Sequence, residues 1–313
     1  PVPISAEHGT GLGDLYDALE PFLEAGDASA EMLEISDEDE EVERGPLRLA
    51  IVGRPNVGKS TLVNTLISDD RVLTGPEPGV TRDAIPVDWS FGGRDIRLVD
   101  TAGIRRRSQV VAQIERMSVA ATERAIRLAE VVVLVIDATV MLERQDLAIA
   151  RQVVEEGRAL VIAANKWDLI DDSATQLGLL NDRIERSLPQ IKGIRTLTLS
   201  ALTGHNVTRL MGVVFAAYEI WNQRVPTGAL NRWLAALTER HPPPAVHGRP
   251  QRLRYITQIK ARPPSFVLFA SRPSEVPASY LRYLENGLRE DFKFQGTPIR
   301  INLRAGKNPY VQE

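Results

Sequence analysis

The sequence predicts an α/β fold, in which a doubly wound, mostly parallel sheet is followed by a smaller α+β domain. Three observations support this prediction. Strand-like and helix-like segments alternate from residue 47 to about residue 221. A glycine-rich loop separates the first strand from the first helix. Beyond Pro226, the segments follow the order helix, strand, strand, helix, strand. Alternation like that of the first region is typical of parallel sheets with helices on both faces.

Apolar runs predict the strands of the first region, and amphipathic spacing predicts its helices. The run Val131–Ile136 is continuous and apolar, as expected of a strand that is covered on both faces. The turn Phe91-Gly92-Gly93-Arg94 predicts a hairpin, which makes one edge strand antiparallel. The expected strands are 47–53, 84–91, 94–100, 130–137, 159–165 and 195–200, and the expected helices are 58–67, 110–128, 142–156, 174–187 and 206–221.

The second region begins after Pro226 with an amphipathic helix expected at 227–240. The prolines of His241-Pro242-Pro243-Pro244 end this helix, because proline cannot continue one. The remaining expected elements are strands at about 251–260 and 265–271, a helix near 277–291 and a last strand at about 298–304.

The first 45 residues predict two further segments. Residues 1–23 contain Ser5-Ala6-Glu7-His8-Gly9, which resembles Ser200-Ala201-Leu202-Thr203-Gly204 later in the chain. We therefore expect residues 1–23 to be the C-terminal remnant of a similar preceding domain, with coincidence as the alternative. Residues 24–45 are expected to be an acidic linker, since positions 24–43 carry ten acidic residues and no Lys or Arg. The α/β domain would then span 46–222 and the smaller domain 223–313.

The composition of the 313-residue chain is that of an ordinary globular protein, 43% hydrophobic and 25% charged. The absence of cysteine excludes disulfides and cysteine-bound metal, and it fits a reducing compartment. The apolar runs are too short for a membrane span. The net charge of −3 hides an asymmetry, since residues 227–313 hold 14 Lys/Arg against 6 Asp/Glu. This excess suggests nucleic-acid contact near the C-terminal end.

The stretch Gly53-Arg54-Pro55-Asn56-Val57-Gly58-Lys59-Ser60 fits the phosphate-binding pattern G-x-x-x-x-G-K-[ST]. Its glycines let the backbone wrap an anion without a Cβ in the way. The N–H groups of the loop and of the next helix point at the phosphates. Lys59 is expected at the β- and γ-phosphates, and the Ser60 hydroxyl suits Mg²⁺. An ordinary glycine-rich turn is the alternative, and the flanking strand and helix argue against it.

Polar motifs follow three further strands. Asp100, in Asp100-Thr101-Ala102-Gly103, can hold Mg²⁺ through water, and Gly103 lets an amide approach the γ-phosphate. In Asn165-Lys166-Trp167-Asp168, Asp168 can accept two hydrogen bonds from guanine, for which adenine offers no matching donors. Asn165 can hold neighbouring loops, and the Lys166 stem can cover the base. In Ser200-Ala201-Leu202, the Ala201 amide can meet guanine O6.

Thr81 lies in the segment Gly79-Val80-Thr81-Arg82-Asp83, after the first helix. A mobile Thr at this place could reach Mg²⁺ only when a γ-phosphate is present. We therefore expect a switch that the triphosphate orders and that hydrolysis releases.

The motifs above resemble those of the bacterial GTPase family Der, also called EngA, which has two tandem GTPase domains and a C-terminal KH-like domain. Residues 46–222 resemble the second GTPase domain and 227–313 the KH-like domain, including His241-Pro242-Pro243 and Gly306-Lys307-Asn308-Pro309-Tyr310. Residues 1–23 resemble the end of the first GTPase domain, so the chain resembles a fragment of a longer protein. The resemblance implies a P-loop GTPase fold with a KH-like domain.

The same resemblance implies that the chain hydrolyses GTP in a cytoplasmic switch for assembly of the large ribosomal subunit. Its implied partners are that subunit, its rRNA and the missing first GTPase domain, and its implied cofactors are GTP or GDP and Mg²⁺. The implied catalytic residues are Lys59, Thr81 and Asn56, and the implied metal ligands are Ser60, Thr81 and Asp100. The nucleotide contacts would come from Gly53, Asn56, Val57, Gly58, Lys59, Ser60, Thr61, Asp100, Gly103, Asn165, Lys166, Asp168, Ser200, Ala201 and Leu202.

The source of catalytic power is less evident. Ile104 stands where GTPases usually carry a water-orienting Gln, and a hydrocarbon cannot orient water, so slow intrinsic turnover is expected. Relatives with Asn at the position of Asn56 bind K⁺ beside the phosphates, and extending this to Asn56 is a hypothesis. Arg105, Arg106 and Arg107 could act on phosphates or RNA, or could belong to a solvated loop.

Two other functions stay open on sequence alone. A tRNA-modification GTPase usually ends with a catalytic cysteine, which this chain lacks. A scaffold that binds GTP and RNA without hydrolysis is compatible with Ile104. The KH-like region has no G-x-x-G loop for clamping RNA, so shape and phosphate contacts or a purely protein-binding role are both compatible with it.

Overall fold

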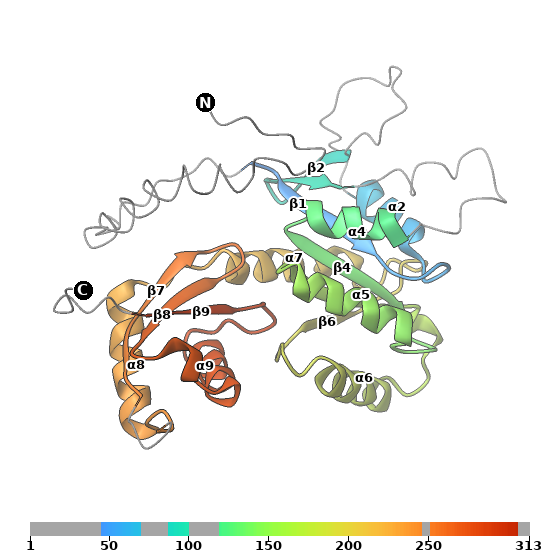
Figure 1. Cartoon of the computed structure of the whole chain (residues 1–313). Coiled ribbons are helices and arrows are strands. Elements are labelled where there is room, and N and C mark those ends of the chain that lie inside the picture. Colours follow the sequence, from blue (N-terminus) through green and yellow to red (C-terminus); the bar gives the residue numbers. More distant parts are fainter. Residues whose placement is uncertain (1–44, 70–86, 100–118, 246–250, 306–313) are drawn as a thin grey trace, which may run out of the picture. The chain divides into compact units, whose positions relative to one another are not determined.

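The computed structural model describes residues 45–69, 87–99, 119–245 and 251–305 (Figure 1). The expected remnant at 1–23, nearly all of the expected acidic linker and the C-terminal Gly306–Tyr310 motif lie outside these residues. Arg44–Glu313 form one compact unit of the chain. Both predicted folded regions therefore belong to the same unit.

Among the described residues, six strands form one sheet in the order β2-β3-β1-β4-β5-β6. All neighbouring strands are parallel except β2 and β3, which are antiparallel. The hairpin between these two turns at Gly92 and Gly93, whose φ angles are 58° and 78°. The predicted doubly wound, mostly parallel sheet is thus confirmed. Its strands are β1 (Leu47–Val52), β2 (Val87–Phe91), β3 (Arg94–Leu98), β4 (Val131–Asp137), β5 (Ala159–Asn165) and β6 (Arg195–Thr198).

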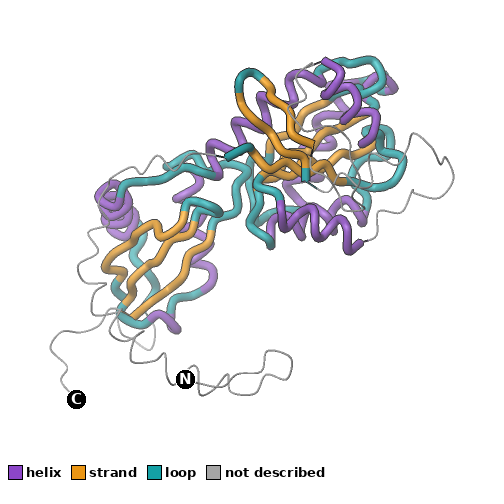
Figure 2. The backbone as a smooth tube through the Cα atoms, turned by 90° about the horizontal axis from the view of Figure 1, so that it is seen from above, coloured by secondary structure: helices purple, strands orange, loops and turns teal. Residues whose placement is uncertain are grey.

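Helices cover both faces of this sheet, as Figure 2 shows. One apolar cluster joins the sheet to α2 (Lys59–Asp69) and α7 (Val207–Trp221). A second cluster, on the opposite face, joins it to α4 (Val119–Leu128), α5 (Arg144–Glu155) and α6 (Ser173–Ser187). Strand β4 supplies alternate residues to the two clusters, which explains why its sequence is apolar without interruption.

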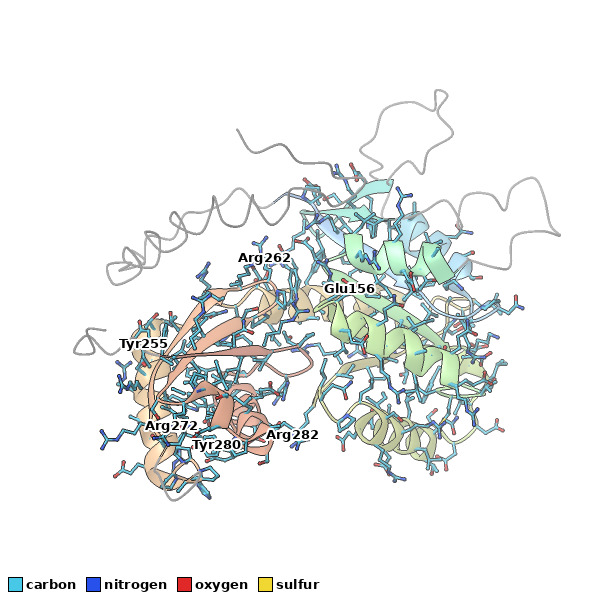
Figure 3. All side chains as sticks on the ribbon, in the orientation of Figure 1. Glu156, Tyr255, Arg262, Arg272, Tyr280 and Arg282 are labelled. Atoms are coloured by element: carbon cyan, nitrogen blue, oxygen red, sulfur yellow. The ribbon has the colours of Figure 1, made fainter. Side chains whose placement is uncertain are left out.

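The smaller region contains α8 (Thr227–Arg240), β7 (Leu253–Lys260), β8 (Ser265–Ala270), α9 (Ala278–Asp291) and β9 (Arg300–Ala305). Its sheet has the order β7-β8-β9, with an antiparallel first pair and a parallel second pair. Trp233 from α8, Phe266 from β8 and Leu284 from α9 pack in one apolar core. In Figure 3, Tyr255 marks β7 and Tyr280 marks α9. The predicted order of elements is therefore observed.

Hydrogen bonds and an ion pair join the smaller region to the main region near the amino ends of its strands. The Gly296 amide donates to Lys192 O at 2.8 Å, on the loop before β6. Arg300 Nη2 donates to the carbonyl of Glu155, the last residue of α5, at 2.7 Å. Arg262, labelled in Figure 3, lies 3.9 Å from the Glu130 carboxylate. These contacts leave the carboxyl ends of the strands, at the opposite edge of the sheet, available for a ligand.

The observed bounds differ from the expected ones by one or two residues at several ends. The strand expected at 195–200 ends at Thr198, because the Ser200 amide donates to His205 O and closes a turn instead. The strand expected from 251 begins at Leu253, where pairing with Ala270 starts. Helix α9 begins after Pro277, which occupies its N-cap position. Parts of the elements expected at 84–91, 94–100 and 110–128 lie outside the described residues.

Candidate nucleotide-binding site

A pocket of about 330 Å³ opens beyond the carboxyl ends of β1, β5 and β6. Ligands of doubly wound sheets bind at this edge, because the loops that follow the parallel strands converge there. The pocket brings together residues from three predicted motifs that are far apart in the chain. Its lining consists of Asn56, Gly58, Lys59, Ser60, Thr61, Asn165, Lys166, Asp168, Leu169, Ser200, Ala201 and Leu202.

The loop between β1 and α2 requires glycine at both of its ends. Gly53 has a φ of 147°, and a Cβ there would lie 2.3 Å from Val135 O. Gly58 has a φ of 95°, and a Cβ there would lie 2.2 Å from Asn165 Nδ2. Asn56, between them, is exposed and left-handed, with a φ of 63°. A side chain at either end would collide with β4 or with Asn165, so the loop can lie this close to them only with glycine at both ends.

Lys59 lies at the start of α2, and its ammonium group folds back over the loop. Its Nζ donates to Gly53 O at 2.9 Å and to Arg54 O at 2.6 Å. These two carbonyls hold the charge at the mouth of the loop. The N-terminus of α2 adds its own positive dipole at the same place. The arrangement favours an anion.

Asn165 joins the loops on both sides of the pocket, as the sequence predicted. The residue is 3% exposed, so its amide has little water to bond. Its Nδ2 donates to Val57 O at 2.7 Å, and its Oδ1 accepts from the Ala201 amide at 2.8 Å. The sequence predicted that the Ala201 amide meets guanine O6. In the structure this amide donates to Asn165 Oδ1 instead. Thr65 Oγ1 also holds this loop, through Ala201 O at 3.0 Å.

Asp168 and Lys166 form the other wall of the pocket. Lys166 is left-handed, with a φ of 63°, and Asp168 follows in the short turn Trp167–Leu169. The Asp168 carboxylate is exposed, so the edge of a planar base can reach it. The Lys166 ammonium lies 2.5 Å from Asp137 Oδ2, which fixes the direction of its stem.

Asp137 forms an ion pair with the Lys166 ammonium, and the sequence analysis assigned it no role. Burial disfavours its charge, but hydrogen bonds from Lys166 and Thr139 outweigh burial, so its pKa lies below the ordinary value. A signal was available: Asp137 ends β4 directly opposite Asn165, which ends β5. The sequence analysis also assigned no role to Arg54 and Asp146, whose side chains form an ion pair.

Three predicted site residues, Thr81, Asp100 and Gly103, lie outside the described residues, as does Ile104. Of the predicted metal ligands, Ser60 is described, and it lines the pocket half-buried. Across the described parts of the chain, no group of three or more His, Asp or Glu side chains could hold a metal by itself. No helix in those parts combines the length and the apolar character needed to cross a bilayer.

A loop built to surround phosphates, opposite a carboxylate placed for a purine edge, defines the class of P-loop GTPases. Two protein-family models match the chain. One, described as 50S ribosome-binding GTPase, matches residues 48–166. The other, described as the KH-domain-like C-terminal region of EngA bacterial GTPase enzymes, matches residues 224–304.

Curated relatives extend this match to nearly the whole chain. GTPase Der of Parvibaculum lavamentivorans is 52% identical over 327 residues, covering 99% of this chain and 69% of the relative. GTPase Der of Rhodopseudomonas palustris (strain TIE-1) is 53% identical over 314 residues, covering 100% of this chain and 68% of the relative. The chain belongs to the GTPase Der family. It binds guanine nucleotide and hydrolyses GTP.

Solved structures with a similar fold include Era in complex with MgGDPNP and nucleotides 1506–1542 of 16S ribosomal RNA. That structure is 22% identical to this chain, with a TM-score of 0.42, and the match covers 84% of this chain and 93% of Era. A single-residue variant of Aquifex aeolicus Era bound to GDP·AlF4⁻ is 20% identical, with a TM-score of 0.40, and the match covers 84% of this chain and 94% of that one.

Proposed function

We propose that this GTPase is a GTP-driven switch that acts in assembly of the large ribosomal subunit. The observation that carries the proposal is the pocket in which Asn165 joins the phosphate loop to the loop that selects the base. In such a pocket the loop that contacts the phosphates and the loop that contacts the base are connected through Asn165. Support for the ribosomal role comes from the 50S ribosome-binding description of the matching family and from the excess of Lys and Arg in residues 227–313.

In this proposal the phosphates lie against the loop amides, and Lys59 neutralises the β- and γ-phosphates. Val57, Gly58, Ser60 and Thr61 supply the amides at the start of α2, where the helix dipole also favours negative charge. The glycines at positions 53 and 58 support this fit, because they let the loop lie against Val135 O and Asn165 in a conformation that a Cβ would prevent.

The residues present also fit Mg²⁺, which when bound neutralises charge that develops on the β- and γ-phosphates. The Ser60 hydroxyl is the described candidate ligand, and it lies beside Lys59 in the pocket lining. Thr81 and Asp100 complete the proposed set from outside the described residues. All three side chains offer oxygen ligands, which are the ligands that a hard cation such as Mg²⁺ prefers.

Base selection is proposed to rest on Asp168. Its carboxylate accepts hydrogen bonds from N1–H and N2–H₂ of guanine, while the Lys166 stem covers one face of the base. Asp137 holds the Lys166 ammonium away from that face, at 2.5 Å. Because Asn165 engages the Ala201 amide, we propose that the amide of Leu202, which also lines the pocket, meets guanine O6.

The hydrolytic step lacks a Gln after Gly103, and Asn56 is the proposed alternative source of catalysis through K⁺. Asn56 supports this because it is exposed, lines the pocket and is held in a left-handed conformation beside Lys59. We expect faster GTP hydrolysis in KCl than in NaCl at equal ionic strength, and an Asn56→Ala variant should lose this difference. Equal rates of the unmodified chain in the two salts would remove Asn56 from the mechanism.

The KH-like region is proposed to contact rRNA and the first GTPase domain, in the cytoplasm. To test the ribosomal role, the chain is sedimented with large ribosomal subunits in GTP, in GDP and without nucleotide. The expected result is co-sedimentation that is strongest with GTP and that Lys59→Ala abolishes. Binding that is equal in all three conditions would contradict a switch, while hydrolysis could still be intact.

A further inference from the structure

Arg54, the second residue of the phosphate loop, joins that loop to the start of α5. Its Nε donates to Asp146 Oδ2 at 2.9 Å, and its Nη1 donates to Glu143 Oε2 at 2.6 Å. Only 16% of the Arg54 side chain is exposed, and Asp146 is fully buried. The guanidinium fork therefore spans two carboxylates on one helix turn, which a lysine ammonium cannot reproduce in the same geometry.

The two carboxylates are themselves fixed by the helix that they begin. Glu143 is the N-cap of α5, and its amide donates to Asp146 Oδ2 at 3.0 Å within a capping box. Asp146 Oδ2 thus receives one bond from the helix start and one from the phosphate loop. The anchor for Arg54 is rigid, because its position is set by the first turn of a packed helix.

The main chain of Arg54 contacts the functional lysine. Its carbonyl accepts from Lys59 Nζ at 2.6 Å, shorter than the 2.9 Å bond from Nζ to Gly53 O. One residue therefore carries both the anchored side chain and a carbonyl that holds the ammonium. Fixing the side chain restricts the backbone of Arg54, and this in turn restricts where Lys59 places its charge.

We infer that Arg54 is a positioning residue for GTP binding and hydrolysis, which acts by orienting Lys59 through its ion pair with Asp146. The inference rests on the proposed role of Lys59 at the β- and γ-phosphates. It adds to the phosphate-loop pattern, in which the position of Arg54 can be any residue.

The ion pair is sensitive to loss of either partner. Burial raises the pKa of the Asp146 carboxyl, although the Glu143 amide and Arg54 both lower it. Among the described residues, Asp146 Oδ1 has no hydrogen-bond partner. Removing Arg54 alone would leave a buried and poorly compensated carboxylate, which destabilises the fold as well as the site. The test must therefore separate the two effects.

The separation comes from a double-mutant cycle in the full chain with Arg54→Ala, Asp146→Asn and both together. Asparagine keeps an oxygen for the Glu143 amide but removes the charge. Dissociation constants are measured by fluorescence titration with methylanthraniloyl-labelled GTP and GDP, and folding is checked by thermal unfolding. We expect Arg54→Ala to weaken both ligands roughly tenfold and the double variant to weaken them no further, as for coupled neighbours.

Two readouts distinguish positioning from a general loss of structure. GMP carries no β- or γ-phosphate, so its affinity, measured by competition, should stay unchanged in Arg54→Ala while GDP affinity falls. Arg54→Lys keeps the charge without the fork and should recover part of the lost GDP affinity. The matched control is Arg183→Ala, which removes a bond of 3.0 Å from Arg183 Nε to Leu142 O near the same helix start. It should leave all three affinities unchanged.

The outcomes also separate this inference from the proposed site. If Lys59→Ala leaves GDP affinity intact, the proposed phosphate site is wrong. If Lys59→Ala weakens GDP but the effects of Arg54→Ala and Asp146→Asn simply add, the inference alone is overturned. An equal loss for GMP and GDP would also overturn it, because that pattern indicates damage to the whole pocket. Should Arg54→Ala fail to fold, the Asp146→Asn and Arg54→Lys variants carry the same comparison.

Discussion

Asn165 joins two loops through opposite ends of one small amide. Replacing it with alanine leaves the Val57 carbonyl and the Ala201 amide without these partners in a site that is 3% exposed. Each buried group left unpaired costs about 1–3 kcal/mol, so with two such groups the unfolding free energy of Asn165→Ala should fall by roughly 2–6 kcal/mol. Urea unfolding measures this change, and GDP affinity should fall with it.

The control for this variant is Asn181→Ala, at an exposed asparagine on α6. Its unfolding free energy should stay within about 0.5 kcal/mol of the unmodified chain. If Asn165→Ala behaves like Asn181→Ala, the amide does not hold the loops together.

The Asp137–Lys166 ion pair predicts a dependence of stability on pH. The folded pKa of Asp137 is lowered, so the pair contributes fully above the unfolded pKa of about 3.9 and is lost as the pH falls through the folded pKa. Asp137→Asn should therefore be less stable than the unmodified chain near neutral pH. The difference should shrink below about pH 4, in urea titrations at a series of pH values.

A surface pair supplies the comparison for this prediction. Asp182 and Arg186 lie 3.2 Å apart on α6, but 62% and 80% of their side chains are exposed. Asp182→Asn should change stability little at any pH, because water screens such pairs. A pH profile of Asp137→Asn that is parallel to that of the unmodified chain would contradict the contribution of this partly buried pair.

At the scale of elements, the helices and the loops make opposite demands on glycine. Gly178 is exposed on α6, and a Cβ there would meet nothing within 4 Å. Gly178→Ala should therefore raise the unfolding free energy by about 0.5–1 kcal/mol through helix propensity. Gly58→Ala would place its Cβ 2.2 Å from Asn165 Nδ2 and should abolish GDP binding. Thermal unfolding and GDP titration of the two variants check both expectations, and a stabilised Gly58→Ala that still binds GDP would contradict the tight wrapping of the loop.

Sequence alone predicted most elements, because alternating apolar runs and turn residues determine them locally. It also predicted that Lys59, Asn165 and Asp168 share a pocket, since loops after parallel strands meet at one edge of a sheet. It did not predict the Arg54–Asp146 pair. The two residues are 92 positions apart, and their contact depends on where α5 packs against the sheet. No local pattern contains that information, and the same holds for the engagement of the Ala201 amide by Asn165.

At the scale of the whole unit, Gly296 forms a close contact between the smaller region and the loop before β6. Its φ is 69°, and a Cβ there would lie 2.8 Å from Gly193 O. Gly296→Ala should displace the Gly296–Lys192 hydrogen bond and accelerate amide hydrogen exchange at position 296. Gly92→Ala is the matched control, because its φ is also positive, at 58°, but a Cβ meets nothing within 4 Å. If both variants lose the same stability, backbone strain alone accounts for the effect and the contact adds nothing.

Helix α5 is held at both of its ends by groups that belong to different parts of the chain. Its 12 residues span about 18 Å at 1.5 Å per residue. Arg54 forms an ion pair with Asp146 in the first turn, and Arg300 from β9 donates a hydrogen bond to the last residue, Glu155. Because the helix is rigid over this length, a tilt at its first turn also moves its last turn. The loop that holds Lys59 is thus connected through α5 to the C-terminal sheet, and because α5 also packs on β4 and β5, a displacement of the helix would reach these strands too.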